Sequence, residues 1–344
     1  MRKRCLAEIA VTAAAAVALL SPPPVAAQTA SDARAAGGAP AESWVPPRTP
    51  WGEPDLQGTF SNRTITPFER PAGVGDREFF TPDEVAALEK RAAEQSGDEE
   101  RSPGTRRDVE RAYNDFWWDR GTKVTTLRTS LVVDPPDGQV PPLTEEARQR
   151  AAAESTRPVY RSAGVGGRGT ASWLDRSTFE RCITRGLPGA MSPTAYNNNY
   201  RITQSPGIVA IQIEMLGGTR VVPTDGRKHL SPSIRNWMGD SVGRWEGDTL
   251  VVETTNFSDK VLYRGAAENL RLVERFTRVG PKEIDYRVTI IDPTTFTRPW
   301  TLAIPYVDIG EQLFEYACHE GNYGMVGILS GAREEERAAA EGAR

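Results

Sequence analysis

Residues 200–319 form a series of short segments in which apolar and polar side chains alternate. A period of two places successive side chains on opposite faces of a β-strand, and turns rich in Gly and Pro separate the segments. Since no helix of crossover length lies between them, we expect an antiparallel meander. The predicted strands are 209–215, 219–222, 249–257, 270–279, 284–292, 297–304 and 313–318.

Such a meander has two exposed edges, which proteins hide by closing or stacking the sheet. About eight alternating strands suffice for a small up-and-down barrel around one ligand. The expected fold class is therefore mainly β: an antiparallel meander closed as a lipocalin-like (calycin-type) barrel, with an N-terminal helical and irregular appendage. A β-sandwich is the main alternative. An immunoglobulin-like topology fits less well, because two cysteines bracket the whole meander.

Those two cysteines are Cys182, just before the meander, and Cys318, in its last predicted strand. In an oxidising compartment we expect them to form a disulfide that joins the beginning of the β domain to its end.

The N-terminus has the features of a secretory signal peptide, which we place at residues 1–27. Residues 2–4 are basic, 11–20 are apolar, and 25–27 are small residues suited to cleavage. The apolar run is too short for a good membrane span, so no transmembrane segment is expected. The predicted localisation is periplasmic or secreted.

The remaining chain is predicted to divide into four parts. Residues 28–50, rich in Ala, Gly and Pro, are expected to be a disordered linker. An extended and helical N-terminal region (51–180) should pack on the barrel domain (181–332), and a charged tail (333–344) should be a frayed helix or disordered. Within the N-terminal region we expect helices at 82–94, 108–118 and 144–154, strands within 51–71 and at 127–133, and a flexible loop at 164–169.

Charge and motif content exclude several functions. The net charge is −4 with both signs interspersed, so a nucleic-acid partner is not expected. The two histidines, His229 and His319, belong to no H-x-x-H or H-E-x-x-H pattern, and no metal site is predicted. No cofactor is expected, and the G-x-S-x-G motif of serine hydrolases is absent from the sequence.

Candidate catalytic residues lie on both sides of the predicted disulfide. Strand alternation would place Glu315 on the same face as His319, and a histidine beside a carboxylate is the usual general-base pair. Two arginines near Cys182 would suit an anionic or carbonyl-bearing ligand. The alternative for His319 is a structural histidine at a strand end. The candidates are His319, Glu320, Glu315, Arg181 and Arg185.

Two further segments supply candidate binding residues. Residues 196–200 offer side-chain amides for either a turn or a polar wall, and 229–240 form either a lid over the pocket or a structural plug. The candidates are Tyr196, Asn197, Asn199, His229, Trp237, Asp240 and Tyr323. The strand carboxylates are expected mostly on the solvated face, and these are Glu214, Glu253 and Glu274.

Two strings resemble those of a family of secreted bacterial proteins: WEGDTLVVETTNF at 245–257 and YACHEGNYG at 316–324. The resemblance runs from about Asp55 to Ala332. It implies a natural, recurring domain and implies no activity, cofactor or substrate.

Taken together, the residues favour a secreted or periplasmic β-barrel that binds a small, partly apolar molecule in its interior. The first alternative is a cofactor-free lyase, isomerase or hydrolase on the same barrel, with His319 as general acid/base. The second is a cell-envelope interaction module, in which Trp117, Trp118 and Trp237 would form an exposed patch.

Overall fold

The computed structural model describes residues 44–95, 119, 121–155 and 169–342. The predicted signal peptide, residues 28–43 of the predicted linker, and the helix predicted at 108–118 lie outside the described residues, as does the loop at 164–169 apart from its last residue. Within the described residues, no helix is long and apolar enough to cross a membrane.

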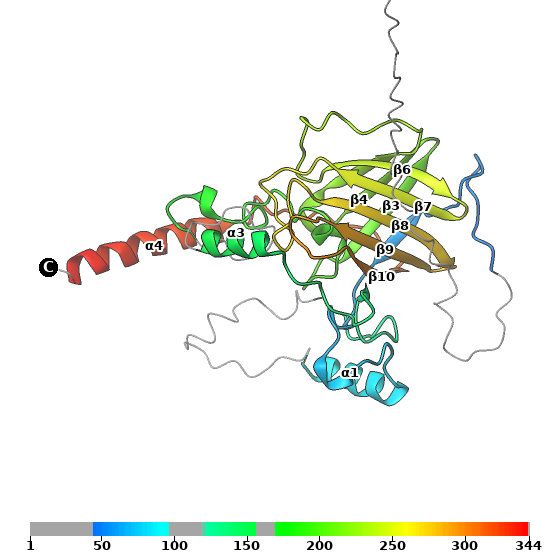
Figure 1. Ribbon diagram of the computed structural model, residues 1–344, viewed down its shortest axis with the longest axis horizontal. Coiled ribbons are helices and arrows are strands. Elements are labelled where there is room, and N and C mark those ends of the chain that lie inside the picture. The colour runs from blue at the N-terminus through cyan, green and yellow to red at the C-terminus, as the bar shows by residue number, and fades with distance from the viewer. Residues whose placement is uncertain (1–43, 96–118, 120, 156–168, 343–344) are drawn as a thin grey trace, which may run out of the picture. The chain divides into compact units, whose positions relative to one another are not determined.

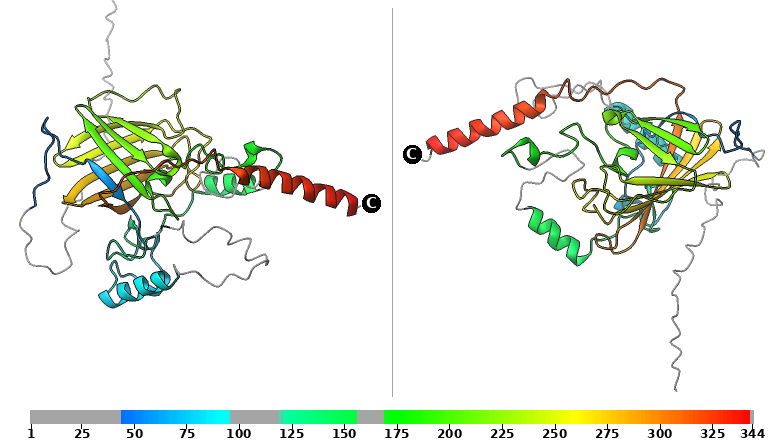
Figure 2. Two further views of the ribbon diagram at one scale, coloured as in Figure 1. Left: turned by 180° about the vertical axis from the view of Figure 1, so that it is seen from behind. Right: turned by 90° about the horizontal axis from the view of Figure 1, so that it is seen from above.

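One antiparallel sheet dominates the structure and curls into a nearly closed barrel (Figures 1 and 2). Its strand order is β5-β4-β3-β1-β10-β9-β8-β7-β6, with β2 paired to β10 beside this path. The mainly β, antiparallel barrel predicted from the sequence is therefore confirmed. The strands are β1 (Gly58–Ser61), β2 (Val132–Asp134), β3 (Asn199–Ser205), β4 (Ile208–Ile213), β5 (Thr219–Pro223), β6 (Asp240–Glu246), β7 (Thr249–Thr255), β8 (Arg271–Gly280), β9 (Glu283–Ile291) and β10 (Trp300–Asp308).

The N-terminal region contributes strands to this sheet. β1 lies between β3 and β10, with Phe60 opposite both Tyr200 and Asp308, and β2 pairs with β10. This placement explains why the strand predicted at 313–318 is wrong: the segment is coil, because β1 already occupies the edge of β10 that a following strand would use. Residues 313–318 therefore alternate between apolar and polar side chains but pair with no strand among the described residues.

β5 and β6 are the two ends of this path, and no hydrogen-bonded ladder joins them across the seam in the described part of the chain. Nine strands that alternate in direction leave the first and last running the same way, so β5 and β6 cannot continue the antiparallel pairing. Side chains close the seam instead. A Cβ built on Gly243 of β6 would lie 2.9 Å from Val222 Cγ1 and 3.0 Å from Thr224 Cγ2, so only glycine leaves room for this contact.

Replacing Gly243 with alanine is expected to lower the unfolding free energy by about 1–3 kcal/mol, since the added methyl group overpacks the seam. Urea unfolding measures the change. Gly218→Ala is the matched control because Gly218 has a negative φ and nothing lies within 4 Å of its built Cβ. An equal effect of the two substitutions would contradict the close approach at the seam.

The helices are α1 (Pro82–Gln95), α3 (Glu145–Ser155) and α4 (Tyr323–Gly342). The first two confirm the predictions at 82–94 and 144–154. At α1, the Thr81 hydroxyl accepts from Glu84 N at 3.3 Å and Glu84 Oε2 accepts from Thr81 N at 2.8 Å, which is a capping box. α4 includes residues 333–342 of the predicted charged tail, for which a helix was one of the two expectations.

Aromatic side chains fill much of the barrel interior. Phe276 on β8 lies 4.7 Å from Tyr286 on β9, and Tyr286 lies 5.0 Å from Tyr306 on β10, measured between ring centroids. Tyr306 stacks on Tyr200 of β3 at 4.9 Å, and all four rings are buried. This row supplies a large part of the hydrophobic stabilisation, and it leaves the strand ends as the places where a ligand has room.

Candidate functional site

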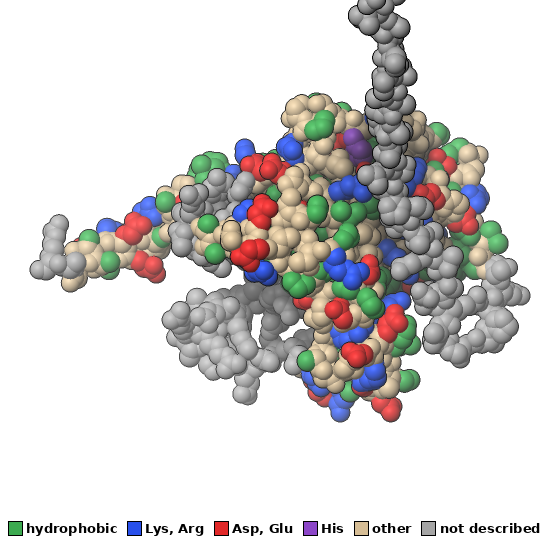
Figure 3. Space-filling model, in the orientation of Figure 1, with side chains coloured by type: hydrophobic (Ala, Val, Ile, Leu, Met, Phe, Trp, Pro, Cys, Tyr) green, Lys and Arg blue, Asp and Glu red, His purple; other side chains and the backbone are tan. Residues whose placement is uncertain are grey.

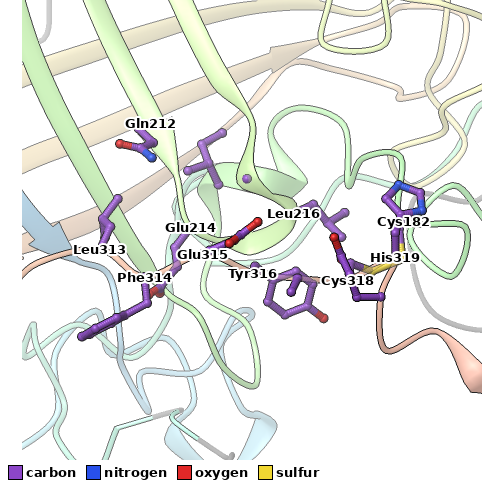
Figure 4. A pocket seen from close by; sticks show the side chains of 14 residues that line it. Cys182, Gln212, Glu214, Leu216, Leu313, Phe314, Glu315, Tyr316, Cys318 and His319 are labelled. Atoms are coloured by element: carbon purple, nitrogen blue, oxygen red, sulfur yellow. A yellow bond between two sulfur atoms is a disulfide. The ribbon is translucent and has the colours of Figure 1, made fainter.

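A pocket of about 420 Å³ opens at the end of β4 (Figure 4). Two segments far apart in sequence form its walls: 212–217, which leads from β4 into β5, and the coil 313–320. Its lining residues are Cys182, Gln212, Ile213, Glu214, Leu216, Gly217, Leu313, Phe314, Glu315, Tyr316, Ala317, Cys318, His319 and Glu320.

The first wall is fixed by a tight turn. β4 ends at Ile213, and the 3₁₀ helix η5 (Met215–Gly217) reverses the chain, with Leu216 at φ 63° and Gly217 at φ 66°. Ile213 N donates to Gly218 O at 2.8 Å, and Glu214 N donates to Asn199 O at 3.0 Å. These bonds tie the turn to β3 and set the direction of the Glu214 side chain.

The second wall is held by the disulfide. Cys182 and Cys318 are bonded, with their Cα atoms 5.7 Å apart, which confirms the predicted pair. Asn322 adds a second tie, since its Nδ2 donates to Glu180 O at 2.9 Å while its Oδ1 accepts from Met325 N at 3.3 Å at the start of α4. The coil 313–320 belongs to no strand, so these ties take the place of a sheet ladder.

The candidate acid/base residues reach the pocket, but they do not form the expected pair. His319 and Glu315 are both exposed, and Figure 4 shows the imidazole beside the disulfide and apart from Glu315. Within the described residues no ion pair joins His319 to Glu315 or Glu320, although Glu320 also lines the pocket. The alternation that would have aligned them requires a strand, and the segment is coil.

The two candidate arginines lie against aromatic rings and outside the pocket lining. The Arg181 guanidinium lies 4.6 Å from the Trp173 ring centroid, and that of Arg185 lies 5.7 Å from the Phe179 centroid. Burial lowers the pKa of Arg185. Among neighbouring groups, Tyr200 does most to oppose this lowering. Neither arginine forms an ion pair with another described residue, so their approach to His319 stays a prediction.

The asparagine segment forms a turn, and none of residues 196–200 lines the described pocket, so a polar wall for a ligand stays a prediction. Asn197 adopts φ 52°, as a turn requires, and the Asn198 side chain bonds to Thr194 and Asp119, which fixes the loop. Asn199 Nδ2 donates to Glu214 Oε2 at 2.8 Å and so contacts a pocket residue directly. Tyr196 stacks on the pocket residue Tyr316, with ring centroids 6.4 Å apart.

The insertion between β5 and β6 forms a separate polar cluster. His229 Nδ1 lies 2.8 Å from Asp240 Oδ2, which also accepts from Leu230 N at 2.9 Å, and His229 Nε2 lies 3.9 Å from Glu253 Oε1. Trp237 is half-buried. None of these residues lines the described pocket, and Tyr323, at the first position of α4, is exposed and does not line it either. Their binding roles stay predictions.

Two of the three strand carboxylates contradict the prediction that they face solvent. Glu274 is 0% exposed and Glu214 is 5% exposed. A sequence signal existed for Glu274, because alternation places it on the same face as Leu272 and Phe276 of β8. For Glu214 there was none, since it follows the last residue of β4.

Glu274 forms a buried ion pair with Arg220 that crosses the seam. Arg220 Nη1 on β5 donates to Glu274 Oε1 at 2.7 Å, and Nη2 donates to Glu274 Oε2 and, at 2.8 Å, to Thr254 Oγ1. Arg220 Nε also donates to Ser241 Oγ on β6 at 3.1 Å, and Tyr286 OH donates to Glu274 Oε1 at 2.9 Å. Burial lowers the pKa of Arg220, but the Glu274 carboxylate outweighs it, so the net pKa lies above the usual value.

Charges of both signs are interspersed over the face shown in Figure 3, in keeping with the absence of a basic stripe in the sequence. Among the described residues, no group of three or more His, Cys, Asp or Glu side chains is placed to hold a metal ion.

Comparison with protein-family models gives no match, and comparison with curated proteins gives none either. One similar solved structure is a "secretary abundant heat soluble (SAHS) protein" from Ramazzottius varieornatus. The alignment has 12% identity and a TM-score of 0.22, and it covers 32% of this chain and 69% of that chain. This likeness is too weak to support an argument about the fold, which rests on strand order and register. The resemblance to a family of secreted bacterial proteins stays a prediction.

Proposed function

We propose that this protein is a periplasmic or secreted β-barrel that binds a small, partly apolar molecule in the pocket at the end of β4. The pocket itself carries the proposal. Its volume of about 420 Å³ falls in the range of small-molecule sites. Its lining combines apolar and aromatic side chains, such as Leu216 and Tyr316, with a larger set of polar groups that includes Gln212 and Glu214.

The proposed binding site lies at the mouth of the barrel and not in the centre of its interior. Tyr200, Tyr286 and Tyr306 are fully buried inside the barrel. Tyr306 stacks on Tyr200 and packs at a tilt against Tyr286, so the three rings occupy the space that an interior ligand would need. At the mouth, the turn after β4 and the disulfide hold the two walls in place before a ligand arrives. A preformed site binds with a smaller ordering cost.

The compartment assignment is supported by the disulfide and by the predicted signal peptide. A disulfide between Cys182 and Cys318 persists in an oxidising environment and is rare in the cytosol. We do not extend the proposal to catalysis by His319, because the described geometry gives that imidazole no carboxylate partner.

Filling the pocket tests the proposal. Ala317 is exposed and lines the pocket, so Ala317→Trp is expected to occupy its volume without disturbing the barrel core. A saturation-transfer NMR screen of small amines, alcohols and acids should give binders of the wild-type protein. Their affinity should fall at least about tenfold in this variant, a loss of about 1.4 kcal/mol.

Gln312→Trp is the matched control, since Gln312 is exposed on the same coil and does not line the pocket. The control should retain the binders found with wild-type protein. A screen without binders, or binders that persist in Ala317→Trp, would refute the proposal.

A further inference from the structure

We infer that the ligand of this pocket carries a positively charged nitrogen, which binds at the Glu214 carboxylate. The inference rests on the proposed function and adds the chemical class of the ligand. A primary ammonium group attached to a small aromatic or alkyl body fits the lining described above.

The first observation is the burial of an uncompensated charge. Glu214 is 5% exposed and lines the pocket. Within the described residues, no Lys, Arg or His nitrogen lies within 4.0 Å of its carboxylate, although ion pairs at that distance are found throughout the barrel, as for Arg220 and Glu274. A buried carboxylate without a cation destabilises the folded protein. A cationic ligand would supply the missing counter-charge.

The second observation is a local shortage of hydrogen-bond donors. Glu214 Oε2 accepts from Asn199 Nδ2 at 2.8 Å, whereas Glu214 Oε1 accepts no hydrogen bond from the described residues. Asn199 Oδ1 is buried and has no hydrogen-bond partner in that part of the chain. Asn199 Oδ1 is therefore a buried acceptor without a donor, while Glu214 Oε1 is open to the pocket that Glu214 lines. An ammonium group has three N–H donors and can bind at this open carboxylate oxygen.

The third observation is the sign of the charges around the pocket. The lining contains the carboxylates of Glu315 and Glu320 in addition to Glu214, and it contains no Lys or Arg. Tyr316 adds an aromatic ring, which attracts a cation over its face. An anionic ligand would meet repulsion at each of the three carboxylates.

Arg185 does not neutralise Glu214. Both charges affect the buried phenol of Tyr200. Burial raises the pKa of Tyr200, the Arg185 guanidinium lowers it, and the Glu214 carboxylate raises it. No ion pair joins Arg185 to Glu214 in the described residues, and Arg185 does not line the pocket. The negative charge therefore remains available on the pocket side.

Three probes of nearly equal shape and different charge test the inference. Isothermal titration of the disulfide-intact protein with benzylammonium, benzyl alcohol and benzoate should give the tightest binding for benzylammonium, by at least about tenfold. Glu214→Gln keeps the bond from Asn199 and removes the charge, so it should weaken benzylammonium by about 10–100-fold and leave benzyl alcohol unchanged.

Glu311→Gln is the matched control, because it removes the same charge at an exposed position outside the pocket lining. It should change each affinity less than about twofold, since exposed charges are well screened. Equal or tighter binding of benzoate or benzyl alcohol would overturn the inference and keep the proposed function. If none of the three probes binds, or if binding survives Ala317→Trp, the proposed function itself fails. Should Glu214→Gln not fold, the ranking of the three probes on wild-type protein still decides the question.

Discussion

Arg220→Met is expected to lower the unfolding free energy by about 3–5 kcal/mol, because it leaves the Glu274 carboxylate buried without a cation. The Arg220 side chain is 3% exposed and that of Glu274 is 0% exposed, so water cannot replace the lost partner without opening the barrel. Arg220 also bonds to Ser241 and Thr254, so the substitution removes the side-chain connection of β5 to β6 and β7. Urea or thermal unfolding followed by circular dichroism measures the change.

Two further variants separate the ion pair from a general effect of losing an arginine. Arg201→Met, on the exposed side of β3, should change stability by no more than about 0.5 kcal/mol. The double variant Arg220→Met/Glu274→Met should recover part of the loss, with a coupling energy of about 0.5–3 kcal/mol in the cycle. An Arg220→Met protein within 1 kcal/mol of wild type would contradict the assigned role of the pair.

The second large effect concerns the disulfide. The double variant Cys182→Ser/Cys318→Ser should lower the unfolding free energy by about 2–5 kcal/mol, because the bond closes a long loop in the unfolded chain. The bonded residues are 136 positions apart in sequence. The loss should also weaken probe binding, since coil 313–320 is joined to the Cys182 loop chiefly by this bond and by Asn322. Unfolding curves and titration with benzylammonium measure the two effects.

Reductant provides the internal control for this prediction. Adding it to wild-type protein should reproduce both effects, and adding it to the double serine variant should change neither. A serine variant that loses stability but binds benzylammonium as wild type does would show that the disulfide does not organise the pocket.

The sheet could be predicted from sequence because most strands alternate clearly and short turns separate them. Val209, Ile211 and Ile213 of β4 are buried together, as a period of two requires. The position of β1 could not be predicted, since four residues carry too little pattern to show that they insert between β3 and β10. That insertion also made the last predicted strand impossible.

The candidate site was predicted in part. The disulfide and the involvement of coil 313–320 follow from the cysteine positions, and His319, Glu315 and Glu320 do line the pocket. Glu214 was missed because its burial depends on a turn with two residues at positive φ, which alternation does not describe. Glu274 was misplaced because a carboxylate was assumed to be solvated, although its position between Leu272 and Phe276 indicated the interior.

The most direct test of the account is chemical-shift mapping of benzylammonium on isotope-labelled, disulfide-intact protein. The account predicts that the perturbed amides cluster at 212–217 and 313–320, the two walls of the pocket, and that Glu214→Gln abolishes most of the shifts. Perturbations centred on the β5–β6 insertion at 224–239, or none at saturating probe, would contradict a cation site at the end of β4.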